Sequence, residues 1–131
     1  MVTVAAGILV RDGRILVCQR KRTGAFALQW EFPGGKVEAG EDARSCLVRE
    51  LHEELAVEAQ IDREVCSLHY TYPNGFEVSL VFFRVGGYTG EVTNCAFEQM
   101  RWVEPVQLTG FDFLEADRDL VGQLARGEIL L

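Results

Sequence analysis

Three glutamates at helical spacing are the first feature of the sequence that could carry chemistry. Glu50, Glu53 and Glu54 are separated as i, i+3 and i+4, so an α-helix would place all three carboxylates on one side. Like charges at this spacing destabilise an isolated helix by roughly 0.2–0.5 kcal/mol per pair. Arg49 lies four residues before Glu53 and can offset part of this repulsion. The alternative interpretation is a charged surface helix with incidental ion pairs.

Glu54 strengthens the case for a bound cation. At about 100° per residue it projects toward the side of the helix that we expect to be buried, between Ala43, Leu47 and Leu51. Burying an unpaired carboxylate costs on the order of several kcal/mol, and a cation would offset that cost. Oxygen ligands without paired His or Cys suit Mg²⁺ or Mn²⁺. Gly34-Gly35, just before the helix, would let backbone atoms approach such an ion closely.

The strongest predicted helix spans Asp42–Leu55 and carries these glutamates. No Gly or Pro interrupts it, and Glu41 and Asp42 place negative charge at its start. Its apolar residues recur at helical spacing and predict one buried stripe, formed by Ala43, Leu47, Val48, Leu51 and Leu55.

The remaining elements are predicted to form a sheet with a closing helix. Asp12-Gly13 is a two-residue hairpin signal between the first two apolar runs. Strands are predicted at Val2–Val10, Ile15–Cys18, Val57–Ile61, Val65–Tyr72, Phe76–Val85 and Met100–Val103, and the closing helix at Ala116–Arg126. We expect loops at residues 21–29 and 86–90, and no regular element where Pro33 and two glycines follow one another. The sum is a sheet flanked by helices, in the α+β or α/β class.

Length, composition and charge limit the possible classes of protein. The 131 residues fit a single domain, 1–131, and 48% apolar with 25% charged residues argue against disorder. No apolar stretch is long enough to span a bilayer, and the apolar N-terminus lacks the flanks of a signal peptide, so we expect a cytoplasmic protein. A net charge of −7 argues against binding to nucleic acid polymers or anionic membranes. The four cysteines form no C-x-x-C pair, and most are expected to be small buried hydrophobes.

Against this acidic background, Arg20-Lys21-Arg22 forms one local basic patch. Three consecutive basic residues are most often a solvated loop. Beside a metal site, the same patch could instead contact a polyanionic substrate.

The segment Gly35–Val57 resembles the Nudix box, G-x5-E-x7-R-E-U-x-E-E-x-G-U, in which U is an aliphatic residue. Every specified position matches except Ala56, which stands where the family has glycine. Ala56 carries no functional group, and its effect would be on how the chain leaves the helix. The preceding segment Trp30–Lys36 is similar to that of the MutT-like branch, so the resemblance covers nearly the whole chain. It implies an α+β fold, an α/β/α sandwich with a mixed sheet between helices.

The resemblance also implies roles for individual residues. Glu50, Glu53 and Glu54 would be the metal ligands and catalytic carboxylates. The Gly35 carbonyl would be a further ligand, Arg49 would orient the glutamates, and Glu41 would brace the loop. Family members often add an acidic residue from a later loop; Glu98 is the candidate, with an exposed loop glutamate as the alternative. A water activated by two or three Mg²⁺ (or Mn²⁺) ions would attack a phosphorus, commonly the β one, and release pyrophosphate.

Five residues are candidates for substrate binding: Arg20, Phe32, Lys36, Tyr72 and Asp117. Arg20 matches a basic position that contacts nucleotide phosphates in MutT-like enzymes. Phe32 and Tyr72 could line a base pocket, but a core position would explain both equally well. Asp117 stands where the branch that cleaves 8-oxo-dGTP commonly has asparagine. An ionised Asp117 would only accept hydrogen bonds, and a protonated one could also donate, but a simple helix N-cap is the competing explanation.

The resulting prediction is hydrolysis of a nucleoside triphosphate to monophosphate and pyrophosphate, with 8-oxo-dGTP as the leading substrate. The nearest alternative is a pyrimidine-preferring enzyme that acts on CTP, dCTP or 5-methyl-dCTP. Cleavage of ADP-ribose is less favoured because the chain lacks an extra N-terminal region. A non-catalytic nucleotide sensor is disfavoured because all box carboxylates are present. The sequence gives no prediction of oligomeric state.

Overall fold

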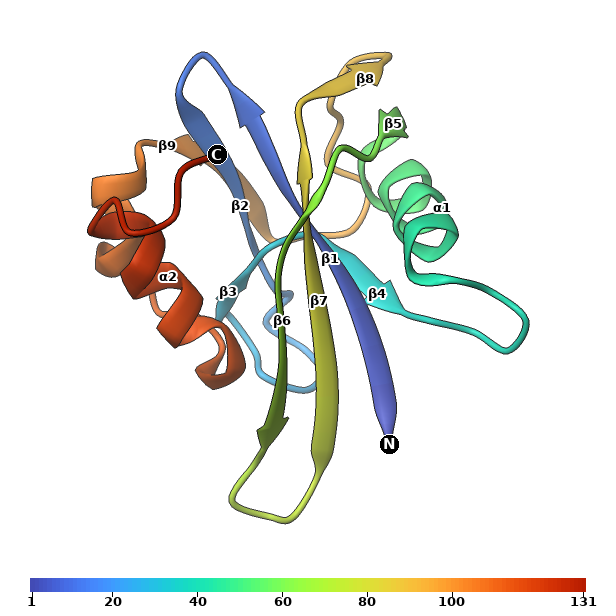
Figure 1. Ribbon diagram of the computed structural model, residues 1–131, viewed down its shortest axis with the longest axis vertical. Coiled ribbons are helices and arrows are strands. Elements are labelled where there is room, and N and C mark those ends of the chain that lie inside the picture. The colour runs from blue at the N-terminus through green and yellow to red at the C-terminus, as the bar shows by residue number, and fades with distance from the viewer.

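A mixed sheet between two helices organises the protein. The computed structural model describes residues 1–131. Figure 1 shows α1 (Ala43–Leu55) and α2 (Arg118–Ala125) on opposite sides of this sheet. Seven strands form it, in the order β3-β2-β1-β7-β6, with β4 paired to β1 and β9 paired to β2. The predicted α+β sandwich is therefore confirmed.

The strands extend from the N-terminus to residue 103. They are β1 (Val2–Arg11), β2 (Arg14–Gln19), β3 (Trp30–Glu31), β4 (Gly34–Lys36), β5 (Glu58–Gln60), β6 (Glu64–Thr71), β7 (Glu77–Val85), β8 (Gly87–Thr89) and β9 (Gln99–Val103). β5 and β8 form a separate two-stranded sheet. β1 runs parallel to β7 and antiparallel to β2 and β4.

β1 lies at the centre and is buried on both faces. Its residues alternate between two hydrophobic cores, as expected where successive side chains point to opposite faces of a sheet. Ala6 and Ile8 belong to the core under α2, whereas Ala5 and Leu9 belong to the core under α1. The sheet therefore separates two hydrophobic cores, and the two helices pack on opposite faces of it.

α1 begins one residue later than predicted. Asp42 is its N-cap, and the carboxylate accepts a 2.7 Å hydrogen bond from the Ser45 N–H. The buried stripe is made by Leu47, Leu51 and Leu55, as expected, but Cys46 takes the place predicted for Val48 and Ala43. Ala43 and Val48 are only half-buried, and Ala43 packs at the edge of the core under α1.

Several predicted boundaries were wrong. Trp30–Gly35 was expected to be irregular, yet β3 and β4 flank Phe32-Pro33 because tertiary pairing with β2 and β1 overrides the local breakers. The 86–90 loop contains β8, which pairs with β5. The closing helix divides into a 3₁₀ turn, η2 (Glu115–Asp117), and α2. A further 3₁₀ helix, η1 (Pro105–Gly110), was not predicted.

The predicted hairpin turn agrees with the structure, whereas the predicted burial of the cysteines is correct for only two of the four. Asp12 and Gly13 have φ values of 51° and 75°, as a two-residue hairpin turn requires. All four cysteines are free, but only Cys18 and Cys46 are fully buried; Cys66 is half-buried and Cys95 exposed. No helix has the length and apolar character needed to cross a membrane.

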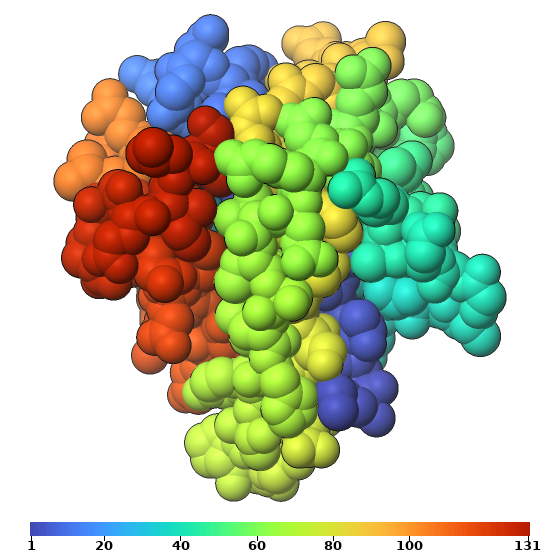
Figure 2. All heavy atoms as spheres, viewed as in Figure 1, coloured from blue at the N-terminus to red at the C-terminus, as the bar shows by residue number.

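Two segments that are distant in sequence enclose one end of the sheet. The hairpin between β6 and β7 projects beyond the helices at the lower end of the molecule (Figure 2). The loop that joins β2 to β3 faces it, and the ring of Phe26 in this loop lies 5.4 Å from the ring of Tyr72 at the hairpin. These segments form part of the wall of a cavity at this end of the sheet.

Candidate active site

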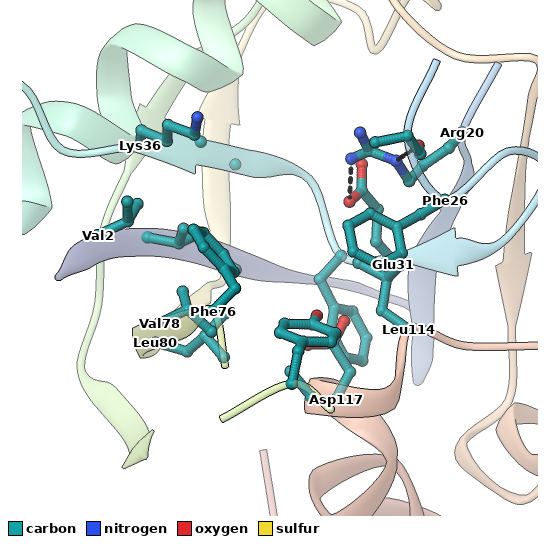
Figure 3. A pocket seen from close by; sticks show the side chains of 18 of the residues that line it. Val2, Arg20, Phe26, Glu31, Lys36, Phe76, Val78, Leu80, Leu114 and Asp117 are labelled. Carbon is teal, nitrogen blue, oxygen red and sulfur yellow. Dashed lines mark hydrogen bonds and ion pairs between the residues drawn. The ribbon is translucent and has the colours of Figure 1, made fainter. Parts of the chain in front are cut away.

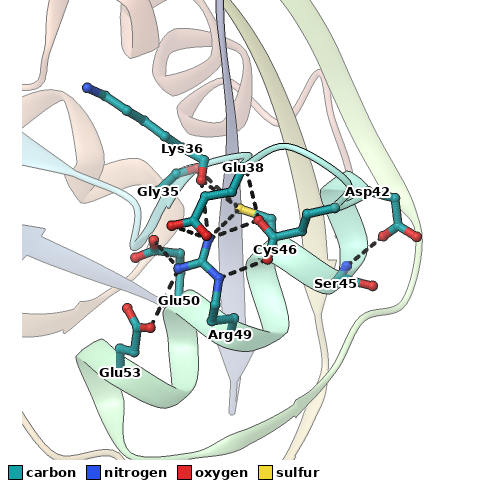
Figure 4. A network of polar contacts seen from close by, with 10 residues as sticks. Gly35, Lys36, Glu38, Asp42, Ser45, Cys46, Arg49, Glu50 and Glu53 are labelled. Atoms are coloured by element: carbon teal, nitrogen blue, oxygen red, sulfur yellow. Dashed lines mark hydrogen bonds and ion pairs between the residues drawn. The ribbon is translucent and has the colours of Figure 1, made fainter.

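Arg49 is the centre of a network of carboxylates on α1 and the preceding loop (Figure 4). Its guanidinium donates to both oxygens of Glu41, at 2.8 and 2.9 Å, and to Glu50 Oε1 at 2.9 Å. Glu53 lies 3.5 Å from the same guanidinium. The hydrogen bonds from Arg49 lower the pKa of Glu41 to about 2. Arg49 therefore stays charged, ties the loop to the helix, and fixes the orientation of Glu50.

Gly35 allows the backbone of β4 to touch the Glu50 carboxyl group. A Cβ at this position would lie 2.3 Å from Glu50 Cδ, so any larger residue would displace the carboxylate. Cys46 fills the other side, and its Sγ lies 3.5 Å from the Gly35 carbonyl oxygen. The backbone of Gly35 and the Glu50 carboxylate, separated by fifteen positions in the sequence, are thereby neighbours.

Glu54 is the most buried carboxylate of the three. It accepts one hydrogen bond, from the Gly34 N–H at 3.0 Å, and forms no ion pair. Burial raises its pKa to about 8, and the nearby charges of Glu50 and Glu31 add to the shift. A half-buried carboxylate with one hydrogen bond and two acidic neighbours is in an environment that a bound cation would stabilise.

Glu53 and Glu98 are less enclosed. The Glu53 side chain is 56% exposed. Glu98 pairs with Arg22 at 3.3 Å, and this contact lowers the pKa of Glu98. The loop before β9 is nevertheless tied to the end of α1, because the Cys95 N–H donates to the Glu54 carbonyl.

A cavity of about 370 Å³ begins beside this carboxylate cluster; we call it the apolar chamber. Its wall includes Glu54 and Gly35 together with all five residues that the sequence proposed for substrate binding, namely Arg20, Phe32, Lys36, Tyr72 and Asp117. Figure 3 shows Lys36 on the left side of the view, the Arg20–Glu31 pair in the upper right and Asp117 at the bottom. Phe32 is only 3% exposed and packs against Phe82 and Phe113, so it serves the core and the cavity at once.

Asp117 is not a capping residue. It precedes α2, but its side chain makes no capping hydrogen bond. It is 3% exposed, the only buried charged residue in the protein, and it faces the apolar chamber. Burial, assisted by the charge of Glu31, raises its pKa to about 8. At neutral pH the carboxyl group is therefore protonated and can both donate and accept a hydrogen bond.

Comparison with known proteins identifies the family to which this fold and carboxylate cluster belong. The family model described as "NUDIX domain" matches residues 1–123. The chain is a Nudix hydrolase. It is 36% identical over 121 residues to the CTP pyrophosphohydrolase of Escherichia coli, an alignment that covers 92% of this chain and 89% of that one.

Two further relatives agree with this Nudix assignment. The 8-oxo-dGTP diphosphatase of Haemophilus influenzae is 34% identical over 125 residues, covering 95% of this chain and 91% of the relative. The solution structure of the E. coli ORF135 protein superposes with a TM-score of 0.83 at 35% identity, covering 93% of this chain and 86% of the other.

Nudix hydrolases use divalent metal ions. In this structure no three acidic side chains converge on one point as a ready-made metal site, but the chemistry of the groups on α1 and β4 suits such an ion. The carboxylates and the exposed side of the Gly35 backbone offer oxygen donors with no thiolate or imidazole among them, which is the set that Mg²⁺ and Mn²⁺ prefer. The under-bonded Glu54 carboxylate and the close approach at Gly35 are the structural observations behind this fit.

Glu31 and Phe26 are among the residues of the apolar chamber that the sequence of this Nudix hydrolase did not single out. Glu31 is half-buried and pairs with Arg20 at 3.0 Å, and removal from water raises its pKa despite that pair. Phe26 also lines the chamber, with a φ of 55° that bulky residues rarely adopt. The signal for Glu31 was a single charge between two aromatic residues, whereas nothing local distinguished Phe26 from an ordinary loop residue.

Proposed function

We propose that this Nudix hydrolase converts a nucleoside triphosphate to the monophosphate and pyrophosphate, and that 8-oxo-dGTP is its preferred substrate. The observation that carries the proposal is that Asp117, buried in an apolar wall, and the Glu54 carboxyl group line the same cavity. A base would lie in the apolar part, and the phosphates would lie at the carboxylates. The name of the relative from Haemophilus influenzae supports the choice of substrate.

At the phosphate end, Glu50, Glu53, Glu54 and the Gly35 carbonyl would hold Mg²⁺, with Mn²⁺ as a substitute, and Glu98 would join them after leaving Arg22. The bound ions would supply charge neutralisation on the phosphates and a more acidic water. Arg49 would keep Glu50 and Glu53 in position, and Arg20 and Lys36 would contact phosphate oxygens.

The proposed reaction breaks the bond between the β-phosphorus and the oxygen that bridges it to the α-phosphorus. One water molecule is consumed. Its oxygen enters the pyrophosphate, the bridging oxygen stays with the monophosphate, and the released proton passes to solvent. Hydrolysis in ¹⁸O-labelled water would therefore label the pyrophosphate alone.

The donor and acceptor pattern of a protonated Asp117 explains a preference for the oxidised base. 8-Oxoguanine presents an acceptor, O6, beside a donor, N7–H, and a carboxylic acid matches both. Unmodified guanine presents two acceptors at the same edge, so the Asp117 carbonyl oxygen would face a lone pair. Leaving such a buried group unpaired costs about 1–3 kcal/mol, which corresponds to about tenfold to hundredfold in kcat/KM.

A pyrimidine substrate is the second candidate. Cytosine places the N3 acceptor beside the N4 amino donor, and a protonated carboxyl group can pair with both. The relative named CTP pyrophosphohydrolase favours this alternative.

A substrate panel distinguishes the candidates. Purified protein with Mg²⁺ would be assayed on 8-oxo-dGTP, dGTP, CTP, dCTP, 5-methyl-dCTP and ADP-ribose, with chromatographic identification of the products. The proposal expects monophosphate plus pyrophosphate, with kcat/KM highest for 8-oxo-dGTP. A higher kcat/KM for a cytosine nucleotide would overturn the choice of 8-oxo-dGTP and favour the pyrimidine alternative. Binding without turnover of any compound would overturn the enzymatic proposal.

A further inference from the structure

A second, smaller cavity adjoins the apolar chamber. It has a volume of about 250 Å³, and we call it the loop chamber because the β2–β3 loop forms one side of it. The two cavities share one wall, made by Arg20, Ala25, Glu31 and Glu54. Beyond this wall the loop chamber is lined by Lys21, Thr23, Gly24, Ala96 and Phe97.

The two chambers differ in chemical character. Twelve of the 19 residues around the apolar chamber are hydrophobic, against 3 of the 9 around the loop chamber. The aromatic rings of Phe26, Tyr72 and Phe76 all lie on the apolar side. A nucleoside triphosphate has the same asymmetry, because its base is flat and largely apolar whereas its terminal phosphates are polyanionic. Glu54, in the shared wall, lies where the two halves of such a molecule would meet.

Lys21 is an unpaired cation at the loop chamber. It is exposed and forms no ion pair, whereas its neighbours Arg20 and Arg22 are paired with Glu31 and Glu98. Lys21 is therefore available to neutralise an anion without first breaking a contact. The hydroxyl group of Thr23, which also lines the chamber, could donate to a phosphate oxygen.

We propose that the loop chamber is the subsite for the β- and γ-phosphates, and that Lys21 and Thr23 retain the pyrophosphate after cleavage. This inference rests on the proposed function. It gives the two products separate positions: the monophosphate stays with its base in the apolar chamber, and the pyrophosphate lies across the Arg20–Glu31 wall. It also assigns a specific role to part of the basic segment 20–22.

Product inhibition of the full-length protein with Mg²⁺ tests the assignment. Hydrolysis of the best nucleoside triphosphate would be measured against added inorganic pyrophosphate and, separately, against the corresponding monophosphate. Lys21→Gln should raise the inhibition constant of pyrophosphate about threefold to tenfold, the usual range for losing one phosphate-directed charge, and should leave that of the monophosphate within about twofold. Thr23→Val should act in the same direction with a smaller effect.

Two controls complete the experiment. Arg14→Gln removes an equally exposed charge at the distant β1–β2 hairpin and should change neither constant. Asp117→Asn, at the base end, should alter the constant of the monophosphate but not that of pyrophosphate. An unchanged pyrophosphate constant in Lys21→Gln, or equal changes for both products, would overturn the loop-chamber assignment. Failure of the wild-type protein to release pyrophosphate would instead contradict the proposed function itself.

Discussion

At the scale of single residues, the site depends on two carboxyl groups. Burial raises the pKa of both by a similar amount, but their neighbouring groups differ. Glu54 and Asp117 both have a pKa raised to about 8 by removal from water. Glu54 lies beside other carboxylates and the Gly35 backbone, which is a setting for a cation. Asp117 lies among apolar and aromatic side chains, which is a setting for a neutral hydrogen-bonding group. The same removal from water thus makes Glu54 suited to bind a metal ion and Asp117 suited to form hydrogen bonds with a nucleobase.

Glu54→Gln should separate metal binding from folding. The amide cannot supply the negative charge, so kcat should fall by about 100-fold or more. In wild-type protein, Mg²⁺ at ten times its Kd should add about 1.4 kcal/mol of stability and raise the melting temperature by about 5 °C. The variant should lose most of that increase in differential scanning fluorimetry.

Glu64→Gln, which changes an exposed glutamate of β6, is the matched control for Glu54→Gln and should retain both activity and the metal response. An equal Mg²⁺-dependent increase in all three proteins would remove Glu54 from the metal site.

Asp117→Asn should change the pH dependence of both activity and stability. The folded wild-type protein holds the Asp117 proton up to about pH 8, while the unfolded chain releases it near the ordinary value of 3.8. The contribution of Asp117 to wild-type stability therefore declines between about pH 4 and pH 8, by an amount on the order of several kcal/mol. The asparagine has no proton to lose, so the stability of the variant relative to wild type should increase with pH across this window.

The activity of the wild type should decline above about pH 8 as Asp117 ionises and stops donating to the base. The Asp117→Asn variant should lack this decline, because its amide remains both donor and acceptor. Chemical unfolding at pH 4.5 and pH 8, together with kcat/KM between pH 6 and pH 10, measures both effects. Parallel profiles for the two proteins would show that Asp117 does not titrate in this range.

At the scale of elements, the two capping residues of α1 determine where the helix begins and ends. Asp42 caps the first turn, and Ala56 ends the helix in the left-handed conformation, with φ 60° and ψ 34°. The Nudix box has glycine at this position, and an alanine in this conformation is strained by about 1 kcal/mol. The departure from the motif therefore affects the end of the helix and leaves the carboxylates in place.

Ala56→Gly should stabilise the protein. Relief of the left-handed strain, less the added freedom of the unfolded chain, should contribute about 0.5–1 kcal/mol and raise the melting temperature by about 2–4 °C. Ala39→Gly, in the exposed loop before α1, is the control in which the same substitution relieves no strain, because Ala39 has no positive φ. It should lower stability slightly. Thermal unfolding of the three proteins in parallel would decide; a lower melting temperature for Ala56→Gly would refute the strain argument.

At the scale of the whole molecule, the site is assembled from segments that the sheet brings together. The β2–β3 loop, the β6–β7 hairpin and the residues before α2 surround the apolar chamber, although they are spread from residue 20 to residue 117. The contact between Phe26 and Tyr72 joins the loop to the hairpin across this cavity.

Phe26→Ala should weaken substrate binding without unfolding the protein. Base stacking on an aromatic ring contributes about 1–3 kcal/mol, so KM should rise about fivefold or more while kcat changes little. The melting temperature should change by less than about 2 °C, because the ring is 44% exposed. Leu28→Ala alters the other large exposed apolar residue of this loop, which does not line the chamber, and should leave KM unchanged. Equal effects of both substitutions on KM would mean that the loop acts only through its general stability.

Local sequence determined the helix, its acidic face and the family, because helical periodicity, Asp42 and the box spacing act over a few residues. It also predicted the burial of Glu54, since its angular position follows from the turn of the helix. Only the tertiary structure decided that Gly34 and Gly35 join the sheet, that Asp117 faces a cavity instead of capping α2, and that Glu31 and Phe26 line that cavity. These features depend on strand pairing and burial between distant segments, and neither the protonation of Asp117 nor the division into two chambers can arise before those segments meet.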